Sequence, residues 1–172
     1  MNTDRDYNYE LLQRVESDFE ERFGVQPAIV LRSPGRINLI GEHTDYNDGF
    51  VLPSAVSQGI YMAIGPATDC VHHWHALDLD STVQIGSDGL GALREDWSDF
   101  VHGAWLAVRE HSDALPYFNL TFSADLPIGS GMSSSSALTC GILYGMNHIA
   151  GLDLPDKTIP EMAYHVERGF IG

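Results

Sequence analysis

The chain is poor in basic residues. It has 9 of them against 24 acidic residues, and Lys157 is its single lysine. The formal net charge at pH 7 is therefore −15. A surface of this charge repels the phosphates of nucleic acids and the head groups of anionic lipids. Neither a nucleic acid nor a membrane is expected as a partner.

Cysteines and long hydrophobic runs are also scarce. Cys70 and Cys140 lie far apart and have no metal-binding spacing, so we expect two free, buried thiols in a reducing compartment. No apolar run approaches the length needed to span a membrane. The polar start, MNTDRDYNYE, does not resemble a signal peptide. These absences predict a soluble cytoplasmic protein.

The composition suits one α+β domain with a hydrophobic core, since 44% of the 172 residues are hydrophobic. Apolar spacing and stop signals predict helices over 6–23, from Asp96 or Ser98 to about 110, over 134–149 and from about 158. Strands are expected over 28–40, 50–65 and 70–85, with a half-buried strand at 118–123. Gly141 and Gly145, one turn apart, indicate a closely packed helix. The early strands predict a mixed or antiparallel sheet.

A polar cluster interrupts two apolar strands in SPGRINLIGEHTDYNDGFVLP, residues 33–53. Asp48-Gly49 alone can make the turn. The additional Glu42, His43 and Asp45 suit a ligand with several hydroxyls, because carboxylates accept hydrogen bonds and imidazole can donate or accept. A metal site would need a further ligand at suitable spacing, and none is obvious. A charged surface loop is the other alternative.

A second motif, PIGSGMSSSSAL, covers residues 127–138 between a predicted strand and a predicted helix. Gly129 and Gly131 let backbone N–H groups approach an anion, and the helix N-terminus adds partial positive charge. These features suit a polyphosphate. The loop lacks the Gly-Lys of a Walker A motif, the third glycine of a dinucleotide fingerprint and any G-x-S-x-G. A flexible Gly/Ser linker remains the alternative.

Taken together, the motifs resemble those of one enzyme family. GRINLIGEHTDYNDG resembles the signature of the galactokinases, and PIGSGMSSSSAL resembles the ATP-binding loop of the wider GHMP kinase superfamily. EDWSDFVHG resembles the galactokinase segment whose tryptophan lies near the nucleotide base. The resemblance implies a ribosomal-protein-like, two-layer mixed sheet with helices packed on one face. It also implies phosphorylation of the anomeric hydroxyl of α-D-galactose, with ATP and Mg²⁺.

The resemblance also implies residue roles. It assigns sugar binding to Glu42, His43, Thr44 and Asp45, and places Arg36 at the reacting centre. An always-charged guanidinium suits a transferring phosphoryl group. A structural ion pair to a neighbouring carboxylate is the alternative for Arg36.

Nucleotide binding is assigned by the same resemblance to Trp97 and to the loop residues Gly129, Ser130, Gly131, Met132, Ser133, Ser134 and Ser135. Ser135 and Glu167 match the Mg²⁺ ligands. The alternatives are a core or surface tryptophan for Trp97 and an exposed helix carboxylate for Glu167.

Three histidines, His72, His73 and His75, invite a metal interpretation. On a strand His73 and His75 share one face, and His72 lies on the other. No acidic or cysteine partner is evident at useful spacing, so we interpret them as ordinary strand residues.

The family's catalytic aspartate, a later glycine-rich motif and the second domain would all follow Gly172. Residues 1–172 are therefore expected to be an incomplete N-terminal domain with little or no kinase activity alone. Such a fragment would expose apolar surface and self-associate, whereas the full-length protein is expected to be a monomer. Two alternatives remain: a related kinase acting on N-acetylgalactosamine or arabinose, and a non-catalytic sensor that binds galactose and ATP.

Overall fold

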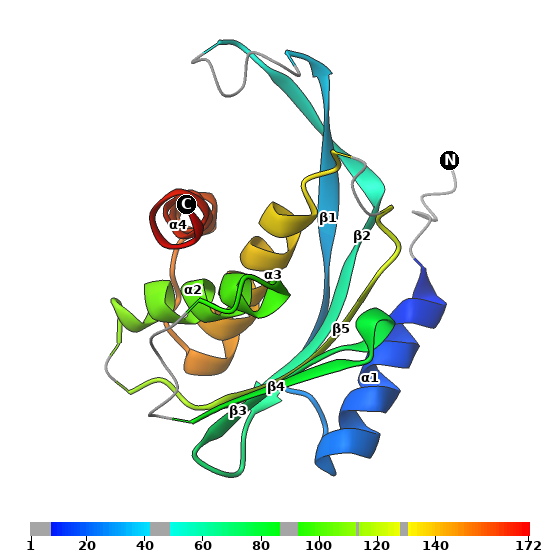
Figure 1. The fold of residues 1–172 in the computed structure, drawn as a ribbon, viewed down its shortest axis with the longest axis vertical. Helices are drawn as coiled ribbons and strands as arrows, with labels where there is room; N and C mark the ends of the chain where they lie inside the picture. Colours follow the sequence, from blue (N-terminus) through cyan, green and yellow to red (C-terminus); the bar gives the residue numbers. More distant parts are fainter. Residues whose placement is uncertain (1–7, 42–48, 87–92, 113, 128–130) are drawn as a thin grey trace.

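The computed structural model describes residues 8–41, 49–86, 93–112, 114–127 and 131–172 (Figure 1). The elements in chain order are α1 (Tyr9–Phe23), β1 (Ile29–Ile40), β2 (Leu52–Pro66), β3 (Val71–Ala76), η1 (Leu77–Leu79), β4 (Ser81–Gly86), α2 (Trp97–Arg109), β5 (Phe118–Ala124), α3 (Ser134–Ala150), α4 (Thr158–His165) and the π-helical turn η3 (Val166–Ile171).

The strands form one sheet in the order β1-β2-β5-β3-β4. Neighbouring strands are antiparallel, except that β3 and β5 run parallel. The predicted α+β fold with a mixed sheet is confirmed. The stretch 70–85, expected to be a strand with polar interruptions, forms two strands joined by η1, because Asp80 adopts a left-handed conformation with φ of 45°. No helix within the described ranges is long and apolar enough to cross a membrane.

Both faces of the sheet carry helices. On one face, α2, α3 and α4 cover the main core, which includes Met62 and Ile64 of β2. On the other face, α1 packs against the alternate β2 residues Tyr61 and Ala63. Figure 1 shows α1 on the opposite side of the sheet from α2, α3 and α4. The expectation of helices on one face holds for α2, α3 and α4 but not for α1, which covers a smaller core on the other face.

The prediction that 118–123 is half-buried is wrong. Phe118 through Ser123 are all buried, because β5 lies in the middle of the sheet. Its polar side chains are used internally: Thr121 donates to the Asp18 carboxylate of α1 at 3.0 Å, and Ser123 donates to Asp78 at 2.8 Å. The alternating polar residues therefore face a second covered surface instead of solvent.

The helix ends follow local chemistry. α1 and α3 both end at glycines in the left-handed conformation, Gly24 and Gly151. α2 begins after Asp96, whose carboxylate accepts the Ser98 N–H at 2.7 Å. The predicted helices and the Asp96 cap are confirmed.

The glycine pair of α3 allows the helix to lie directly on β2. A Cβ atom on Gly141 would come within 2.4 Å of Met62 Cε, and one on Gly145 within 2.3 Å of Ile64 Cδ1. This confirms the predicted close packing.

Gly59 of β2 provides a test of how tightly β1 and β2 are held. A Cβ atom there would lie 2.5 Å from the Ser33 backbone oxygen, which cannot rotate away. Gly59→Ala is expected to lower the free energy of unfolding by about 1–3 kcal/mol, as overpacking does in other cores. Gly86→Ala is the matched control, since no atom lies within 4 Å of that added Cβ. Urea unfolding measures both; equal stability of the two variants would contradict this packing.

His72 of β3 is fully buried in an aromatic cluster. Its ring lies 5.0 Å from Trp105 and 4.8 Å from Tyr117, and its Nδ1 accepts the Phe118 N–H at 3.2 Å. Burial lowers the pKa of His72 to about 4, with a smaller contribution from His102 and His73. In the folded chain the ring therefore stays neutral at pH values well below the ordinary histidine pKa.

The His72 pKa predicts that acid weakens the fold. In the unfolded chain His72 binds a proton near the ordinary histidine pKa of 6.5. In the folded chain its pKa is about 4, so the ring is protonated only at lower pH. Stability is therefore complete above about pH 6.5 and falls between there and pH 4, by at most about 3 kcal/mol from this residue. Burial also lowers the pKa values of His75 and His102, which adds to the slope.

Urea unfolding at about pH 7.5 and about pH 5 measures this slope. His72→Gln retains an acceptor for the Phe118 N–H but does not titrate, so it should flatten the pH dependence. A His72 ring that titrates above pH 6 by NMR would refute the assignment.

Candidate active site

β1 passes directly beneath the serine-rich loop at Gly35. A Cβ atom on Gly35 would meet Leu126 Cδ2 at 2.5 Å and the Met132 backbone oxygen at 3.1 Å. The next residue, Arg36, donates its backbone N–H to that Met132 oxygen at 3.0 Å. Two motifs separated by almost a hundred residues are thereby joined.

The loop leads into the N-terminus of α3. Ser133 has a left-handed φ of 55°, and its carbonyl accepts the Ala137 N–H at 3.0 Å. Its side chain makes no capping hydrogen bond to the helix. The first N–H groups of α3 are thus available to an anion, with the helix dipole favouring negative charge.

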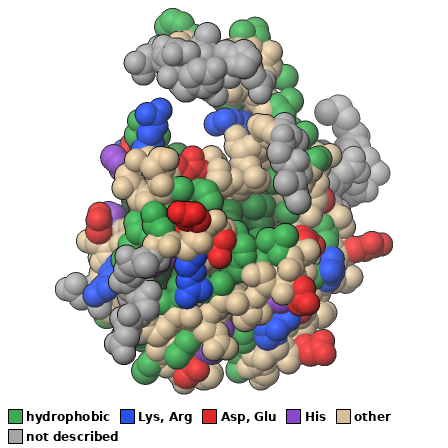
Figure 2. Space-filling view, viewed as in Figure 1, with side chains coloured by type: hydrophobic (Ala, Val, Ile, Leu, Met, Phe, Trp, Pro, Cys, Tyr) green, Lys and Arg blue, Asp and Glu red, His purple; other side chains and the backbone are tan. Residues whose placement is uncertain are grey.

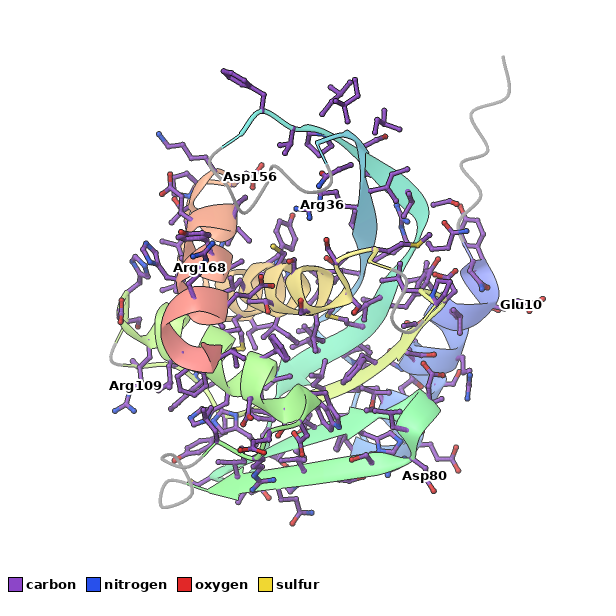
Figure 3. All side chains as sticks on the ribbon, turned by 45° about the horizontal axis from the view of Figure 1, so that its top comes forward. Glu10, Arg36, Asp80, Arg109, Asp156 and Arg168 are labelled. Carbon is purple, nitrogen blue, oxygen red and sulfur yellow. The ribbon has the colours of Figure 1, made fainter. Side chains whose placement is uncertain are left out.

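A groove of about 430 Å³ opens beside this helix start. We call it the Arg36 groove. Its lining comes from β1, α3, α4 and η3: Ser33, Pro34, Arg36, Ser133, Ser136, Ala137, Cys140, Pro160, Ala163, Tyr164 and Glu167. Arg36 lies between β1 and α4 in Figure 3. In Figure 2 this face of the molecule is hollowed, and basic side chains lie on both sides of the hollow.

Glu167 is the acidic member of the Arg36 groove. Its Oε1 atom is buried and accepts no hydrogen bond from any residue that the structure describes. Such a carboxylate oxygen is costly in a protein interior unless a cation or a donor joins it. Glu167 therefore fits a metal ligand better than it fits the exposed helix carboxylate considered from the sequence.

A second groove, of about 360 Å³, lies on the other side of the α3 start. We call it the Trp97 groove. It is lined by Ile60, Ala76, Asp78, Leu79, Trp97, Phe100, Phe122, Ala124, Leu126, Ser134, Ser135 and Leu138. The Trp97 ring packs edge-on to Phe122 at 5.2 Å, and its Nε1–H donates to Ser81 Oγ at 3.3 Å. An apolar groove with a fixed indole suits a flat aromatic base.

The serines of α3 divide between the two grooves. Ser133 and Ser136 share the Arg36 groove with Glu167, whereas Ser134 and Ser135 line the Trp97 groove. The described residues contain no cluster of three or more His, Cys, Asp or Glu side chains that could hold a metal ion by themselves. A cation in the Arg36 groove would therefore need serine hydroxyls and ligand oxygens besides Glu167, as Mg²⁺ commonly does.

The expected sugar-binding residues Glu42, His43, Thr44 and Asp45 lie outside the described residues, as do Gly129 and Ser130 of the loop. The strands on either side of residues 42–48 are described. Near that end of the β1–β2 hairpin, large apolar side chains are exposed: Leu39, Ile40, Phe50, Val51 and Leu52. The described residues on either side of 42–48 therefore expose apolar side chains.

Several residues of the site were missed from the sequence. Ser33, Ser136, Cys140 and Tyr164 line the Arg36 groove, and Phe122 supports Trp97. The helical spacing of positions 133, 136 and 140 could have indicated that they share a face. Both cysteines are free, as expected, but Cys70 is exposed and Cys140 only half-buried, so the expectation of two buried thiols is wrong.

Two family models match the chain. Residues 17–66 match the galactokinase galactose-binding signature, and residues 99–172 match the N-terminal domain of GHMP kinases. The first match contains Arg36 and the polar cluster. The second contains the serines of α3 and Glu167.

Curated relatives agree with these matches. The galactokinase of Roseiflexus sp. is 34% identical over 154 residues, which is 90% of this chain and 39% of that protein. The galactokinase of Thermotoga maritima is 32% identical over 142 residues, covering 83% of this chain and 39% of that protein. The chain thus spans about two fifths of the length of these relatives.

Solved structures give the same picture. The Lactococcus lactis galactokinase complexed with galactose superimposes with a TM-score of 0.82 at 28% identity, over 94% of this chain and 43% of that one. The Methanococcus jannaschii mevalonate kinase has a TM-score of 0.73 at 18% identity, over 81% and 46% of the two chains. The second similarity concerns the fold alone.

The proximity of Glu167 to Cys140 is testable. Burial raises the pKa of the Cys140 thiol, and the Glu167 carboxylate raises it further. Glu167→Gln is therefore expected to lower this pKa and to speed alkylation of Cys140 by iodoacetamide about two- to fivefold near neutral pH, because the thiolate is the reacting form. A Cys70→Ser background removes the exposed thiol.

Glu161→Gln, at an exposed position of α4, is the matched control and should leave the alkylation rate unchanged. An unchanged rate in Glu167→Gln would contradict the arrangement of this groove.

Proposed function

The chain belongs to the galactokinase family, and from this premise we propose that it forms part of an enzyme that transfers the γ-phosphoryl group of ATP to the anomeric hydroxyl of α-D-galactose. One observation carries the proposal most directly: the signature strand and the serine loop meet at Gly35, which brings Arg36 and Glu167 into one groove at the start of α3. A cation, a carboxylate and a helix N-terminus together suit a phosphoryl group.

The nucleotide would lie across the start of α3. In this arrangement its adenine occupies the Trp97 groove against the indole, and its phosphates cross the N–H groups of the first turn. Gly131, Met132 and Ser133 support the phosphates from the described part of the loop, and Gly129 and Ser130 are proposed to do so from outside it.

Glu167 is proposed to hold Mg²⁺ together with a serine of α3. The resemblance assigned this role to Ser135, while Ser133 and Ser136 share the groove with Glu167. A bound Mg²⁺ would neutralise charge on the phosphate oxygens. Arg36, always charged, would stabilise the charge that spreads over the transferring phosphoryl group.

The sugar would be held by Glu42, His43, Thr44 and Asp45, which follow β1 and precede β2 in the sequence. A site of carboxylates and imidazole selects a sugar by pairing each hydroxyl. In the transfer, the anomeric hydroxyl oxygen bonds to the γ-phosphorus as the bond from phosphorus to the ADP oxygen breaks, and the hydroxyl proton leaves to a base.

Activity is proposed for the whole protein, because the chain spans about two fifths of its relatives. The remaining part would complete the cleft and supply the base. Residues 1–172 alone would bind substrates weakly and turn over little or nothing. We propose that the reaction takes place in the cytoplasm, where ATP is available.

The test is galactose-dependent ADP production by the complete protein, with N-acetylgalactosamine and arabinose as alternative acceptors. Arg36→Ala is expected to lower kcat/KM by at least about 100-fold, as loss of a transition-state charge contact does. Arg109→Ala is the matched control: that guanidinium lies 5.3 Å over the Trp105 ring of α2 and outside both grooves, so activity should change little.

Equal activities of Arg36→Ala and Arg109→Ala would refute the role of Arg36. Absence of ADP production with galactose, alongside turnover of another acceptor, would reassign the substrate.

A further inference from the structure

A third groove, lined by polar side chains, lies on the face of the sheet that carries α1. The last residues of α1 form one wall, and β3, β4 and β5 form the floor. Its lining is Arg22, Phe23, Thr68, Asp69, His73, Thr82, Gln84 and Asn119, around a volume of about 360 Å³. We call it the Asn119 groove. The Arg36 groove is on the opposite face of the sheet, among α3 and α4.

The floor of this groove is a polar row across three strands. Gln84 of β4 pairs directly with His73 of β3, and His73 pairs with Asn119 of β5. Side chains at paired positions project to the same face. The row therefore combines amide and imidazole groups that can donate or accept hydrogen bonds.

Asn119 is the unusual member of this row. The residue is only 4% exposed, and nothing in the described part of the chain donates a hydrogen bond to its Oδ1 atom. An unmet buried acceptor destabilises a protein, and asparagine is disfavoured in strands. An apolar residue would serve the fold better at this position, so stability alone does not account for Asn119.

The charged groups of the groove are already paired. Arg22 binds the Asp18 carboxylate at 3.3 Å, and His73 Nε2 lies 3.0 Å from Asp69. The acidic partner that the sequence did not reveal for His73 is thus Asp69. Each charged side chain that lines the groove therefore already has a partner within the protein.

These features define the ligand. The Asn119 Oδ1 atom requires a donor, which excludes a bare anion, and the paired charges favour a neutral molecule. Groups that donate and accept side by side match hydroxyls, and the Phe23 ring, 6.3 Å from the His73 ring, offers an apolar face to C–H groups. The volume suits a molecule the size of one sugar ring.

We propose that the Asn119 groove binds a small, neutral, polyhydroxylated molecule, such as a monosaccharide or cyclic polyol, with one hydroxyl donating to Asn119 Oδ1. This site is separate from the proposed kinase site, since the two lie on opposite faces of the sheet.

The test uses the 172-residue chain, with D-glucose, myo-inositol and glycerol as separate probes at up to about 100 mM, a range that detects weak binding. NMR spectra should show shifts of the Asn119 side-chain amide and the His73 ring that saturate with glucose or inositol. Glycerol, which lacks a ring, should bind more weakly.

Asn119→Val and Asn119→Ala remove the acceptor. Asn119→Val should raise the melting temperature without a probe, because the unmet acceptor is gone. In both variants binding should weaken by at least about tenfold, the usual effect of losing one buried hydrogen bond to a ligand.

Arg36→Ala is the control that separates this proposal from the kinase proposal, and it should bind the probes as the unchanged chain does. Absence of saturating shifts with every probe would overturn the proposal. Saturating shifts with unchanged affinity in Asn119→Ala would also overturn it. A dispersed NMR spectrum would show that Asn119→Ala is folded, so the test does not depend on whether Asn119→Val folds.

Discussion

The site depends on one close contact, the passage of β1 beneath the serine loop. Gly35 leaves no room for a side chain below Leu126 and Met132, and the Arg36 N–H donates to the Met132 oxygen at 3.0 Å. This backbone hydrogen bond joins the strand that carries Arg36 to the loop that leads into the helix carrying the serines. The two segments are distant in sequence, and their contact lies beside the groove that Arg36 and Glu167 both line.

The sheet allows this contact because its two faces are used differently. Met62 and Ile64 of β2 accept α3 so closely that Gly141 and Gly145 have no space for side chains, which fixes the start of α3 relative to β1. Tyr61, on the other face of the same strand, joins α1 and donates to Asp125 at 3.3 Å. Asp125 in turn accepts the Gly59 N–H at 2.7 Å, just where β2 passes Pro34 of β1. The back of the sheet thus supports the strand positions on which the front depends.

Local chemistry could be predicted from the sequence, whereas partners across the fold could not. Gly24, Gly151 and Asp96 end or begin helices through bonds to residues a few positions away, so their roles are visible in the sequence. The polar alternation of β5 predicted a solvent-facing side, since nothing in it reveals that Asp18 of α1 lies over Thr121. The pairing of His73 with Asp69 was missed although the two residues are only four positions apart, because it depends on the bend before β3. Within the site, the family motifs supplied Arg36, Trp97 and Glu167, but not that Ser136 and Cys140 lie beside Glu167.

The helical period explains why the start of α3 serves two grooves. Successive residues of an α-helix point about 100° apart, so four consecutive serines cannot all face one ligand. Positions 133, 136, 137 and 140 face Glu167, and positions 134, 135 and 138 face Trp97. A ligand extending from one groove to the other must therefore cross the helix axis at its N-terminus, where the free N–H groups are concentrated. A serine run gives each groove its own hydroxyls, and the backbone between them serves both.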